Sequence, residues 1–355
     1  MDAPDQPPPS TIPVRPGEQL DWDRLDRFLT AKVPDLGQLT AIEQFSIGRA
    51  NLTYLLHYSN QRVVVRRPPF GALPLGGHDM RREYKALAGL ATVTEIVARP
   101  LVYEEDPAVI GAPFFAMEYR EGVVIDEALP ASLRHLPDAG HRVGMAVVDA
   151  LAEIHTLDPA QAGLEDLGRP AGYLERQVVG WLRRWESVSE VGGEIPDVAQ
   201  VGEALRSGLP PLQRVSILHN DYKLDNCQFA PAEPDRVITI FDWDMATLGD
   251  PLADVGTLLN YWPDDHGEFA GPTGLRSMAL PSHDEALEHY AARTGLDVGG
   301  IRWYCAFACW KTAVAIRQLV ARRQRGESAD DRIETHAASV AVFAARGRRI
   351  LEERR

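Results

Sequence analysis

The sequence predicts an α+β fold of two lobes, with an antiparallel β-sheet in the first lobe and mostly helices in the second. Two patterns support this prediction. Between residues 39 and 119, apolar runs of β-branched and aromatic residues alternate with polar or Gly-containing turns, as strands of a meander do. After residue 130, apolar residues recur at steps of three and four, the spacing of one helix face. We therefore expect a Pro-rich arm over residues 1–19, an N-lobe over 20–119 and a C-lobe over 120–355.

The N-lobe elements follow in order. Leu20, Leu25, Phe28 and Leu29 predict a short helix that ends before Pro34. Apolar runs predict strands, with one helix between the third and the fourth; the strands are Leu39–Phe45, Leu52–Tyr58, Arg62–Arg66, Ile96–Glu104 and Phe114–Tyr119, and the helix is His78–Leu90. In the simplest interpretation the segment Ser46–Asn51, with its single Gly, is a hairpin turn, and Gly122 marks a hinge after the last strand.

The C-lobe is expected to be helical except around one stretch. Its predicted helices cover residues 141–158, Tyr173–Ser187, Val201–Leu209, Ala253–Tyr261, His283–Thr294, Ile301–Gly326 and 330–355, and Trp262–Leu280 is expected to be irregular. His155 closes the first of these helices, so we interpret it as a structural residue rather than a catalyst. Trp303, Phe307 and Trp310 form an apolar stripe of the kind that packs in a core.

Residues 215–260 carry the polar side chains that indicate chemistry. The apolar runs Val215–Leu218 and Val237–Phe241, joined through a turn with two Pro residues, predict a hairpin that brings Asp221 and Asn226 near Asp242. A Mg²⁺ ion takes few protein oxygens and keeps waters and nucleotide phosphates in its shell, which suits Asn226 and Asp242. Asp221 is placed to accept a proton from an attacking hydroxyl. Any one of these residues alone would fit local turn chemistry, so the hypothesis depends on their combination.

The spacing of this stretch resembles a known catalytic pattern. His219-x-Asp221-x-x-x-x-Asn226, followed by an apolar strand and Asp242-Trp243, is similar to the kinase-like aminoglycoside phosphotransferase and choline kinase branch. Within it, the chain resembles phosphotransferases that stand alone or are fused to acyl-CoA dehydrogenases. The segments that carry this closer resemblance are NLTYLL (51–56), RRPP (66–69), DMRREY (79–84), DPAVIGAPFFAMEYREG (106–122), GYLERQVVGW (172–181), HNDYKLDN (219–226), FDWDMATLGDPLADVG (241–256) and WYCAFACWKTAV (303–314). The resemblance implies a two-lobed protein kinase-like fold.

The resemblance also implies roles for the residues of the central stretch. Asp221 would be the catalytic base, and Asn226 and Asp242 would be the Mg²⁺ ligands. Asp250 and Asp254 match positions that brace the catalytic loop in relatives. Asn220 replaces the usual Gly of the catalytic turn. Because Asn tolerates left-handed backbone angles, we expect the turn to keep its shape.

The nucleotide site that the resemblance implies lies mostly in the N-lobe. Arg66 ends the third strand where kinases carry a phosphate-binding lysine, and Glu83 lies where the helix partner of that lysine is expected. An exposed helical carboxylate is the alternative for Glu83. The loop and hinge residues expected to contact ATP are Ser46, Gly48, Asn51, Met117, Glu118 and Tyr119. The loop has one Gly where relatives carry consecutive glycines.

Composition limits the classes of partner. The chain has 37 basic and 51 acidic residues, a net charge of −14 and a pI near 5.2, which argues against a nucleic-acid partner. The three cysteines, Cys227, Cys305 and Cys309, form no metal-binding pair and are expected to be reduced. No apolar stretch is long enough to cross a membrane, and the Pro-rich start lacks a signal-peptide core. We expect a cytoplasmic monomer or homodimer.

These observations favour an ATP- and Mg²⁺-dependent kinase that phosphorylates a hydroxyl group of a small molecule. The resemblance to acyl-CoA dehydrogenase fusions favours a hydroxyacyl-CoA or a related alcohol as the acceptor. An aminoglycoside or another antibiotic is the first alternative, because Asp244, Asp264, Asp265 and Glu268 would suit a polyamine sugar, unless they form only a solvated loop. The second alternative is a nucleotide-binding module with little catalysis, which Arg66 in place of lysine and the altered phosphate loop suggest.

Overall fold

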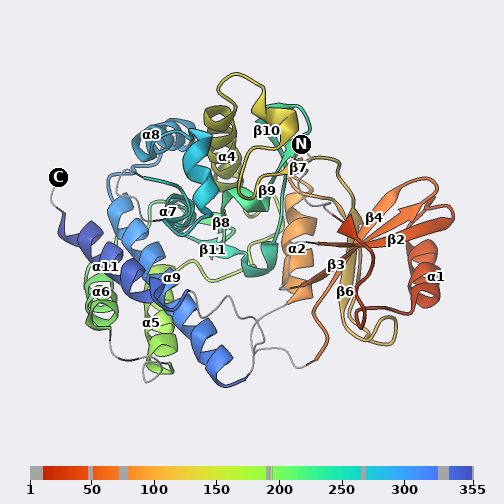
Figure 1. The fold of residues 1–355 in the computed structure, drawn as a ribbon, viewed down its shortest axis with the longest axis horizontal. Coiled ribbons are helices and arrows are strands. Elements are labelled where there is room, and N and C mark those ends of the chain that lie inside the picture. Colours follow the sequence, from red (N-terminus) through yellow and green to blue (C-terminus); the bar gives the residue numbers. More distant parts are fainter. Residues whose placement is uncertain are drawn as a thin grey trace, which may run out of the picture.

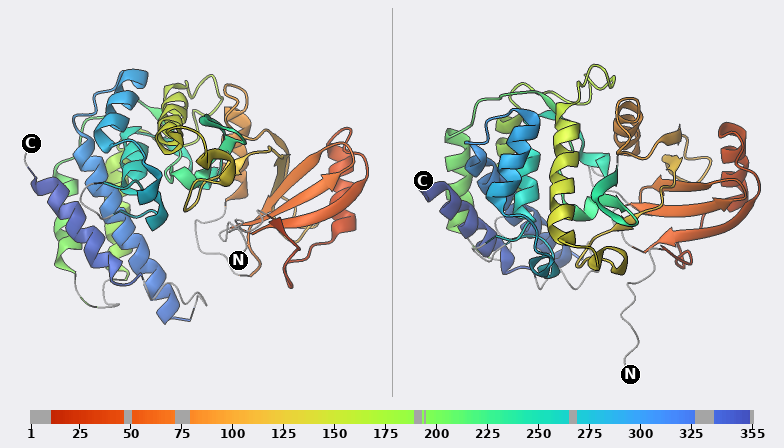
Figure 2. Two further views of the ribbon diagram at one scale, coloured as in Figure 1. Left: turned by 45° about the horizontal axis from the view of Figure 1, so that its top comes forward. Right: turned by 90° about the horizontal axis from the view of Figure 1, so that it is seen from above.

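The computed structural model confirms the two-lobed α+β fold, as Figure 1 shows. It describes residues 11–46, 51–71, 79–188, 193, 195–264, 269–326 and 336–353. Helix α1 (Trp22–Lys32) lies on the outer side of the N-lobe sheet, and α2 (Met80–Leu90) lies between the sheet and the C-lobe. The two further views in Figure 2 show the same order of layers. The sheet, α2 and the strands of the C-lobe therefore meet where the two lobes adjoin.

The N-lobe sheet has six antiparallel strands in the order β1-β2-β3-β4-β6-β5. These strands are β1 (Thr11–Ile12), β2 (Leu39–Phe45), β3 (Leu52–Tyr58), β4 (Arg62–Arg67), β5 (Pro100–Glu104) and β6 (Phe114–Glu118). Successive side chains of a strand point to opposite faces. In β4, Val63 and Val65 pack in a cluster with Leu25 of α1, whereas Val64 packs in the main core with Leu87 of α2. The sheet is therefore buried on both faces.

Several N-lobe boundaries differ from the prediction. Strand β4 runs one residue further, to Arg67, β6 ends one residue earlier, at Glu118, and Thr11–Ile12 of the predicted arm form β1. The strand expected from Ile96 begins only at Pro100, because the carbonyl of Ile96 accepts a hydrogen bond from Ile240 of the C-lobe at 2.8 Å instead of joining the sheet. Helix α2 starts at Met80, where the Asp79 side chain caps it by accepting from the backbone N–H of Arg82 at 3.0 Å. The expected first residue of this helix, at position 78, lies outside the described residues.

The C-lobe is built around the long helix α9. Its helices are α3 (Ala131–Arg134), α4 (Ala139–Thr156), α5 (Tyr173–Glu186), α6 (Pro196–Ser207), α7 (Leu252–Asn260), α8 (His283–Thr294), α9 (Ile301–Gln324) and α11 (Ser339–Glu352). Helix α9 packs against α5, α6, α7 and α11. The helix predicted from Val201 begins earlier, at Pro196, because a proline fits the first turn of a helix, where its missing N–H costs nothing. No helix in the described part of the chain is both long and apolar enough to span a bilayer.

The predicted hairpin of residues 215–218 with 237–241 is wrong in its pairing. Strand β8 (Ser216–Leu218) pairs with β11 (Thr247–Gly249), and β10 (Glu233–Ile240) pairs with β9 (Cys227–Ala230). Strand β9, which the sequence analysis missed, lies two residues before β10. It therefore closes a much shorter loop than the predicted partner would. A further short strand, β7 (Val123–Val124), pairs with β9 on its other side.

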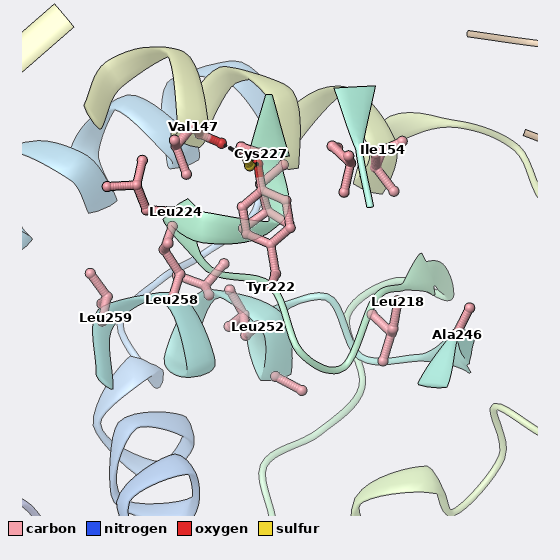
Figure 3. Close-up of a cluster of buried hydrophobic side chains, with 14 of the residues drawn as sticks. Val147, Ile154, Leu218, Tyr222, Leu224, Cys227, Ala246, Leu252, Leu258 and Leu259 are labelled. Atoms are coloured by element: carbon pink, nitrogen blue, oxygen red, sulfur yellow. Dashed lines mark hydrogen bonds between the residues drawn. The ribbon is translucent and has the colours of Figure 1, made fainter. Parts of the chain in front are cut away.

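The loop between β8 and β9 is anchored in the hydrophobic core (Figure 3). The Tyr222 side chain is fully buried between α4 and α7, and its hydroxyl donates to the Val147 carbonyl at 2.8 Å. Leu224 and Cys227 pack beside it. All three cysteines are free, as expected. This anchor holds the polar residues of the loop on a rigid base.

The start of α4 approaches the backbone of the segment Thr273–Met278 so closely that only Gly fits at position 140. A Cβ atom there would lie 1.4 Å from the Met278 carbonyl oxygen. We expect Gly140→Ala to lower the free energy of unfolding by about 1–3 kcal/mol or more. The matched control is Gly180→Ala in α5, where a Cβ meets nothing within 4 Å; it should stabilise by about 0.5–1 kcal/mol. Urea unfolding of both variants measures this, and equal stabilities would contradict the close approach.

Candidate active site

The turn after β8 presents Asp221 at the lobe interface. Asn220 has the left-handed φ of 66° that the sequence analysis expected it to tolerate. The fully buried carboxylate of Asp254, on α7, accepts hydrogen bonds from the backbone N–H of His219 at 2.6 Å and of Asn220 at 2.7 Å. Although burial raises the pKa of Asp254, its hydrogen bond and charge interaction with His155 bring the pKa below the usual value. Asp254 therefore fixes the turn as an ionised carboxylate.

The histidines of the region have structural partners. His219 Nε2 donates to the Phe241 carbonyl at 2.6 Å, and its ring centroid lies 4.8 Å from that of Trp243. His155 is fully buried and bonds the Tyr290 hydroxyl at 2.7 Å. The interpretation of His155 as a structural residue fits these contacts. Asp250 binds the Tyr304 hydroxyl of α9 at 2.8 Å, so among the described contacts the turn is braced by Asp254 rather than by Asp250.

Asn226 and Asp242 come together although the predicted hairpin does not form. The backbone N–H of Phe241 donates to the Asn226 carbonyl at 2.8 Å, which places the next residue, Asp242, beside Asn226. The Asn226 side-chain amide donates to the Asp221 carbonyl, also at 2.8 Å. Asp242 has a left-handed φ of 65° that turns the chain sharply after β10. The three residues thus meet where the 219–226 loop contacts the end of β10.

Arg66 links this site to the N-lobe. Its Nε lies 3.0 Å from Glu83 Oε2 on α2, and a second guanidinium nitrogen pairs with Asp242 Oδ1. Glu83 is buried rather than exposed, and burial raises its pKa to about 7 against the opposing charge of Arg66. The alternating register of β4 turns Arg67 the other way, where its guanidinium lies 3.9 Å from the Phe70 ring. Arg66, and not its neighbour, therefore faces the site.

The residues expected in the phosphate loop are only partly described. Ser46 directly follows β2, and its carbonyl accepts a hydrogen bond from Arg15 at 3.0 Å. Asn51 is buried directly before β3. Gly48 lies outside the described residues. The position of the loop over the site therefore stays a prediction.

Of the three residues expected at the hinge, one lines the site and the other two contact other parts of the chain. Met117 lines a small enclosed cavity of about 20 Å³ together with Arg66, Glu83 and Asp242. The Glu118 carboxylate binds Arg120 Nε at 2.7 Å, and the backbone N–H of Glu118 donates to the Arg99 carbonyl at 3.0 Å. The Tyr119 N–H donates to the Arg62 carbonyl at 3.3 Å, and its ring lies under the Arg62 guanidinium. Of the three, Met117 lies in the site, and the N–H groups of the other two are already used.

Two lysines that the sequence analysis missed lie beside Asp221. Lys223 Nζ is 3.6 Å from Asp221 Oδ2 and 3.4 Å from Asp225 Oδ2. Although burial lowers the pKa of Lys223, the two carboxylates raise it above its usual value. Lys311, on α9, donates to the Asn220 carbonyl at 2.9 Å. A lone cation within the apolar segment 303–314 was the signal that could have identified Lys311.

The oxygen atoms of the site fit a Mg²⁺ ion that arrives with a nucleotide. Among the described residues there is no group of three or more His, Cys, Asp or Glu side chains that could hold a metal alone. Mg²⁺ needs only one or two protein oxygens when phosphates and waters complete its shell. The Asn226 amide nitrogen binds the Asp221 carbonyl, so its Oδ1 could bind a metal, as could the Asp242 carboxylate. Hard oxygen donors without Cys or His suit Mg²⁺ rather than zinc.

An antiparallel N-lobe sheet, a helix glutamate paired with a strand arginine and an Asp–Asn–Asp group at the lobe interface define a kinase-like phosphotransferase. Residues 41–294 match the sequence pattern of the Phosphotransferase enzyme family. The match covers more than half of the chain, and the protein belongs to this family.

Individual relatives agree with this assignment. The acyl-CoA dehydrogenase family member 11 of Gallus gallus is 29% identical over 351 residues, which cover 96% of this chain and 44% of the relative. The chain thus spans less than half the length of that relative. The crystal structure of a putative aminoglycoside phosphotransferase from Ralstonia eutropha is 28% identical, with a TM-score of 0.79 over 94% of this chain and 99% of the other. An aminoglycoside phosphotransferase in ternary complex with AMP-PNP and hygromycin B shares only the fold, at 14% identity, a TM-score of 0.58, and 92% and 97% coverage.

Proposed function

We propose that the protein is an ATP- and Mg²⁺-dependent kinase that transfers the γ-phosphoryl group to a hydroxyl of a small molecule. One observation carries the proposal: the bonds from Phe241 to Asn226 and from Asn226 to Asp221 gather Asp221, Asn226 and Asp242 at one point. Membership of a phosphotransferase family supports it. A module that only binds nucleotide would not need Asp221 beside the two metal-binding residues.

The proposed mechanism assigns one task to each residue. Asp221 orients the acceptor hydroxyl in line with the γ-phosphorus and accepts its proton as the new O–P bond forms and ADP leaves. Asn226 and Asp242 would hold Mg²⁺, which when bound neutralises charge on the β- and γ-phosphates. Arg66, oriented by Glu83, binds phosphate oxygens through its planar fork of donors. Fixed positioning and electrostatics supply most of the rate.

The nucleotide contacts of the N-lobe complete the proposal. The phosphate loop would contribute Ser46, Gly48 and Asn51, and Met117 would contact the adenine from the inner end of β6. Glu118 and Tyr119 would contribute only through groups other than their N–H, because those donors bond other backbone carbonyls. The hinge after β6 would thus recognise the base through carbonyl and apolar contacts.

The acceptor is proposed to be a hydroxyacyl-CoA or a related alcohol. Similarity to acyl-CoA dehydrogenase family members supports this choice. An aminoglycoside is the alternative, because a structure of the same fold is named for its complex with hygromycin B. Asp264, one of the carboxylates that could meet an amino sugar, is already paired with Arg346 at 2.7 Å, which weakens the alternative. Phosphorylation assays with radiolabelled ATP, run on both acceptor classes, separate the two.

Removal of one Mg²⁺ ligand tests the proposed metal site. We expect Asp242→Asn to raise the Mg²⁺ concentration for half-maximal ATP turnover by at least about tenfold. Loss of a residue that only hydrogen-bonds to a metal ligand already lowers metal affinity by about tenfold or more. Chelation of Mg²⁺ should stop turnover in the unsubstituted protein. Asp284→Asn, an exposed carboxylate in the first turn of α8, is the matched control. Unchanged Mg²⁺ dependence and turnover in Asp242→Asn would remove the basis of the proposal.

A further inference from the structure

Lys311 is a partly buried cation that forms no ion pair with any described residue. It projects from α9 and donates to a neutral acceptor, the Asn220 carbonyl, at 2.9 Å. Among the described residues no carboxylate forms an ion pair with Lys311. Burial lowers its pKa below the usual value, although the charges of Asp221 and Asp254 act in the opposite direction. A buried ammonium group is costly unless a negative charge balances it. The positive charge of Lys311 is therefore only partly balanced by the protein.

The nearby carboxylates are already engaged. Asp254 is used by the backbone N–H groups of His219 and Asn220, and Asp221 shares Lys223 with Asp225. Their charges raise the pKa of Lys311, but burial lowers it by more, and neither carboxylate forms an ion pair with Lys311.

A second cation and an aromatic ring extend the positive region. The Arg184 guanidinium, on α5, lies 4.3 Å from the centroid of the Trp181 ring, and Lys311 Nζ lies 5.8 Å from the same centroid. Arg184 is exposed, and its charge lowers the pKa of Lys311 further. Helices α5 and α9 pack against each other. We call these three side chains, Trp181, Arg184 and Lys311, the cationic patch. Through Lys311 the patch contacts Asn220, the residue directly before Asp221.

The location of the cationic patch assigns it to the acceptor rather than to the nucleotide. All three residues belong to C-lobe helices, whereas the proposed phosphate-binding group, Arg66, comes from the N-lobe sheet. Lys311 contacts the residue directly before Asp221, and the charge of Asp221 acts on Lys311, so a group bound at Lys311 lies close to a hydroxyl held by Asp221. A ligand that fills both positions carries its charge near the reacting hydroxyl.

We infer that Lys311 is a specificity-determining residue that binds an anionic group, a carboxylate or a phosphate, of the acceptor. The inference rests on the proposed function and narrows its acceptor to hydroxyl compounds with a negative charge close to the hydroxyl. A polycationic amino sugar would place positive charge against Lys311 and Arg184. The patch thus selects against cationic acceptors as well as for anionic ones.

The test measures equilibrium binding, which does not require turnover. The probes are small hydroxyl compounds of similar size: 3-hydroxybutyrate and glycerol 3-phosphate as the two anions, 1,3-butanediol as the neutral compound and 4-amino-2-butanol as the cation. Trp181 lies beside Lys311, so tryptophan fluorescence reports binding, and Trp181→Phe identifies the part of the signal that comes from this ring. The protein is titrated in the presence of ADP and Mg²⁺.

We expect at least one anion to bind about tenfold or more tightly than the diol, as one charge-assisted hydrogen bond predicts. Lys311→Met should abolish that preference, and Lys311→Arg, which keeps the charge, should retain most of it. Lys32→Met, at the exposed end of α1, is the matched control and should bind like the unsubstituted protein. Binding of 3-hydroxybutyrate would identify the recognised group as a carboxylate, and binding of glycerol 3-phosphate would identify it as a phosphate.

Three results would overturn the inference: equal or tighter binding of the diol or the amine, an anion preference that survives in Lys311→Met, or no saturable signal with either anion. The ligand series on the unsubstituted protein decides the matter even if Lys311→Met does not fold. Failure of the proposed function looks different. In that case the anion preference is present, but no probe receives phosphate from ATP, with or without Mg²⁺.

Discussion

Replacing Asp221 by Asn will lower kcat for phosphoryl transfer by about 10²–10⁴-fold, the range that a positioned general base contributes. Asn has nearly the same shape as Asp, so the hydrogen bond from the Asn226 side chain to the residue 221 carbonyl is preserved. The KM for ATP should change little, because Asp221 faces the acceptor in the proposed mechanism. Steady-state kinetics with an accepted hydroxyl compound measure both parameters. The variant therefore separates loss of chemistry from loss of binding.

The control for this prediction is again Asp284→Asn, whose kinetics should match those of the unsubstituted protein. Equal kcat values for Asp221→Asn and the control would show that Asp221 is not the base. A large rise in the KM for ATP with unchanged kcat would move Asp221 to the nucleotide side of the site. Either result contradicts the assigned role.

Asp254→Asn will cost about 3–5 kcal/mol of stability, the usual loss when one member of a buried charged network is removed. The carboxylate is fully buried and accepts the two backbone N–H groups that shape the turn at Asn220. An amide places its NH₂ group against one of these donors, so at least one buried N–H loses its partner. Urea unfolding measures the loss. Asp250→Asn, a neighbouring buried carboxylate that binds Tyr304 instead of the turn, is the comparison.

The contribution of Asp254 to the free energy of unfolding should decrease as the pH falls. Its pKa in the folded protein is depressed, so its contribution to stability is complete above the unfolded value of about 3.9 and is lost as the pH falls through the folded value. The stability difference between the unsubstituted protein and Asp254→Asn should therefore be full at neutral pH and shrink below about pH 4. A difference that grows toward acid pH would contradict an ionised Asp254.

Sequence patterns predicted those parts of the molecule whose signal is local. A continuous run of β-branched residues identified β4, because Val64 faces one core and its neighbours face another. The spacing between Asp221 and Asn226 identified the loop, because both residues belong to one turn whose backbone shape depends on Asn220. Local patterns thus found the candidate site itself.

The rest depended on contacts between distant segments. Strands β8, β9 and β11 have only three or four residues each, too few for a period to be read, and the partner of β8 lies about thirty residues further along the chain. Lys311 reaches Asn220 across 91 positions, a contact that no local pattern encodes. Predicting these features requires the packing of α9 against α5 and α7, which only the folded chain provides.

The two ion pairs of Arg66 have a consequence for nucleotide binding. The Arg66 guanidinium pairs with Glu83 on α2 of the N-lobe and with Asp242 of the C-lobe. The side chain that is proposed to bind phosphate therefore also links the two lobes. If Arg66 binds phosphate as proposed, an incoming nucleotide would compete with Asp242 for this guanidinium. Nucleotide binding would then exchange one negative partner of Arg66 for another.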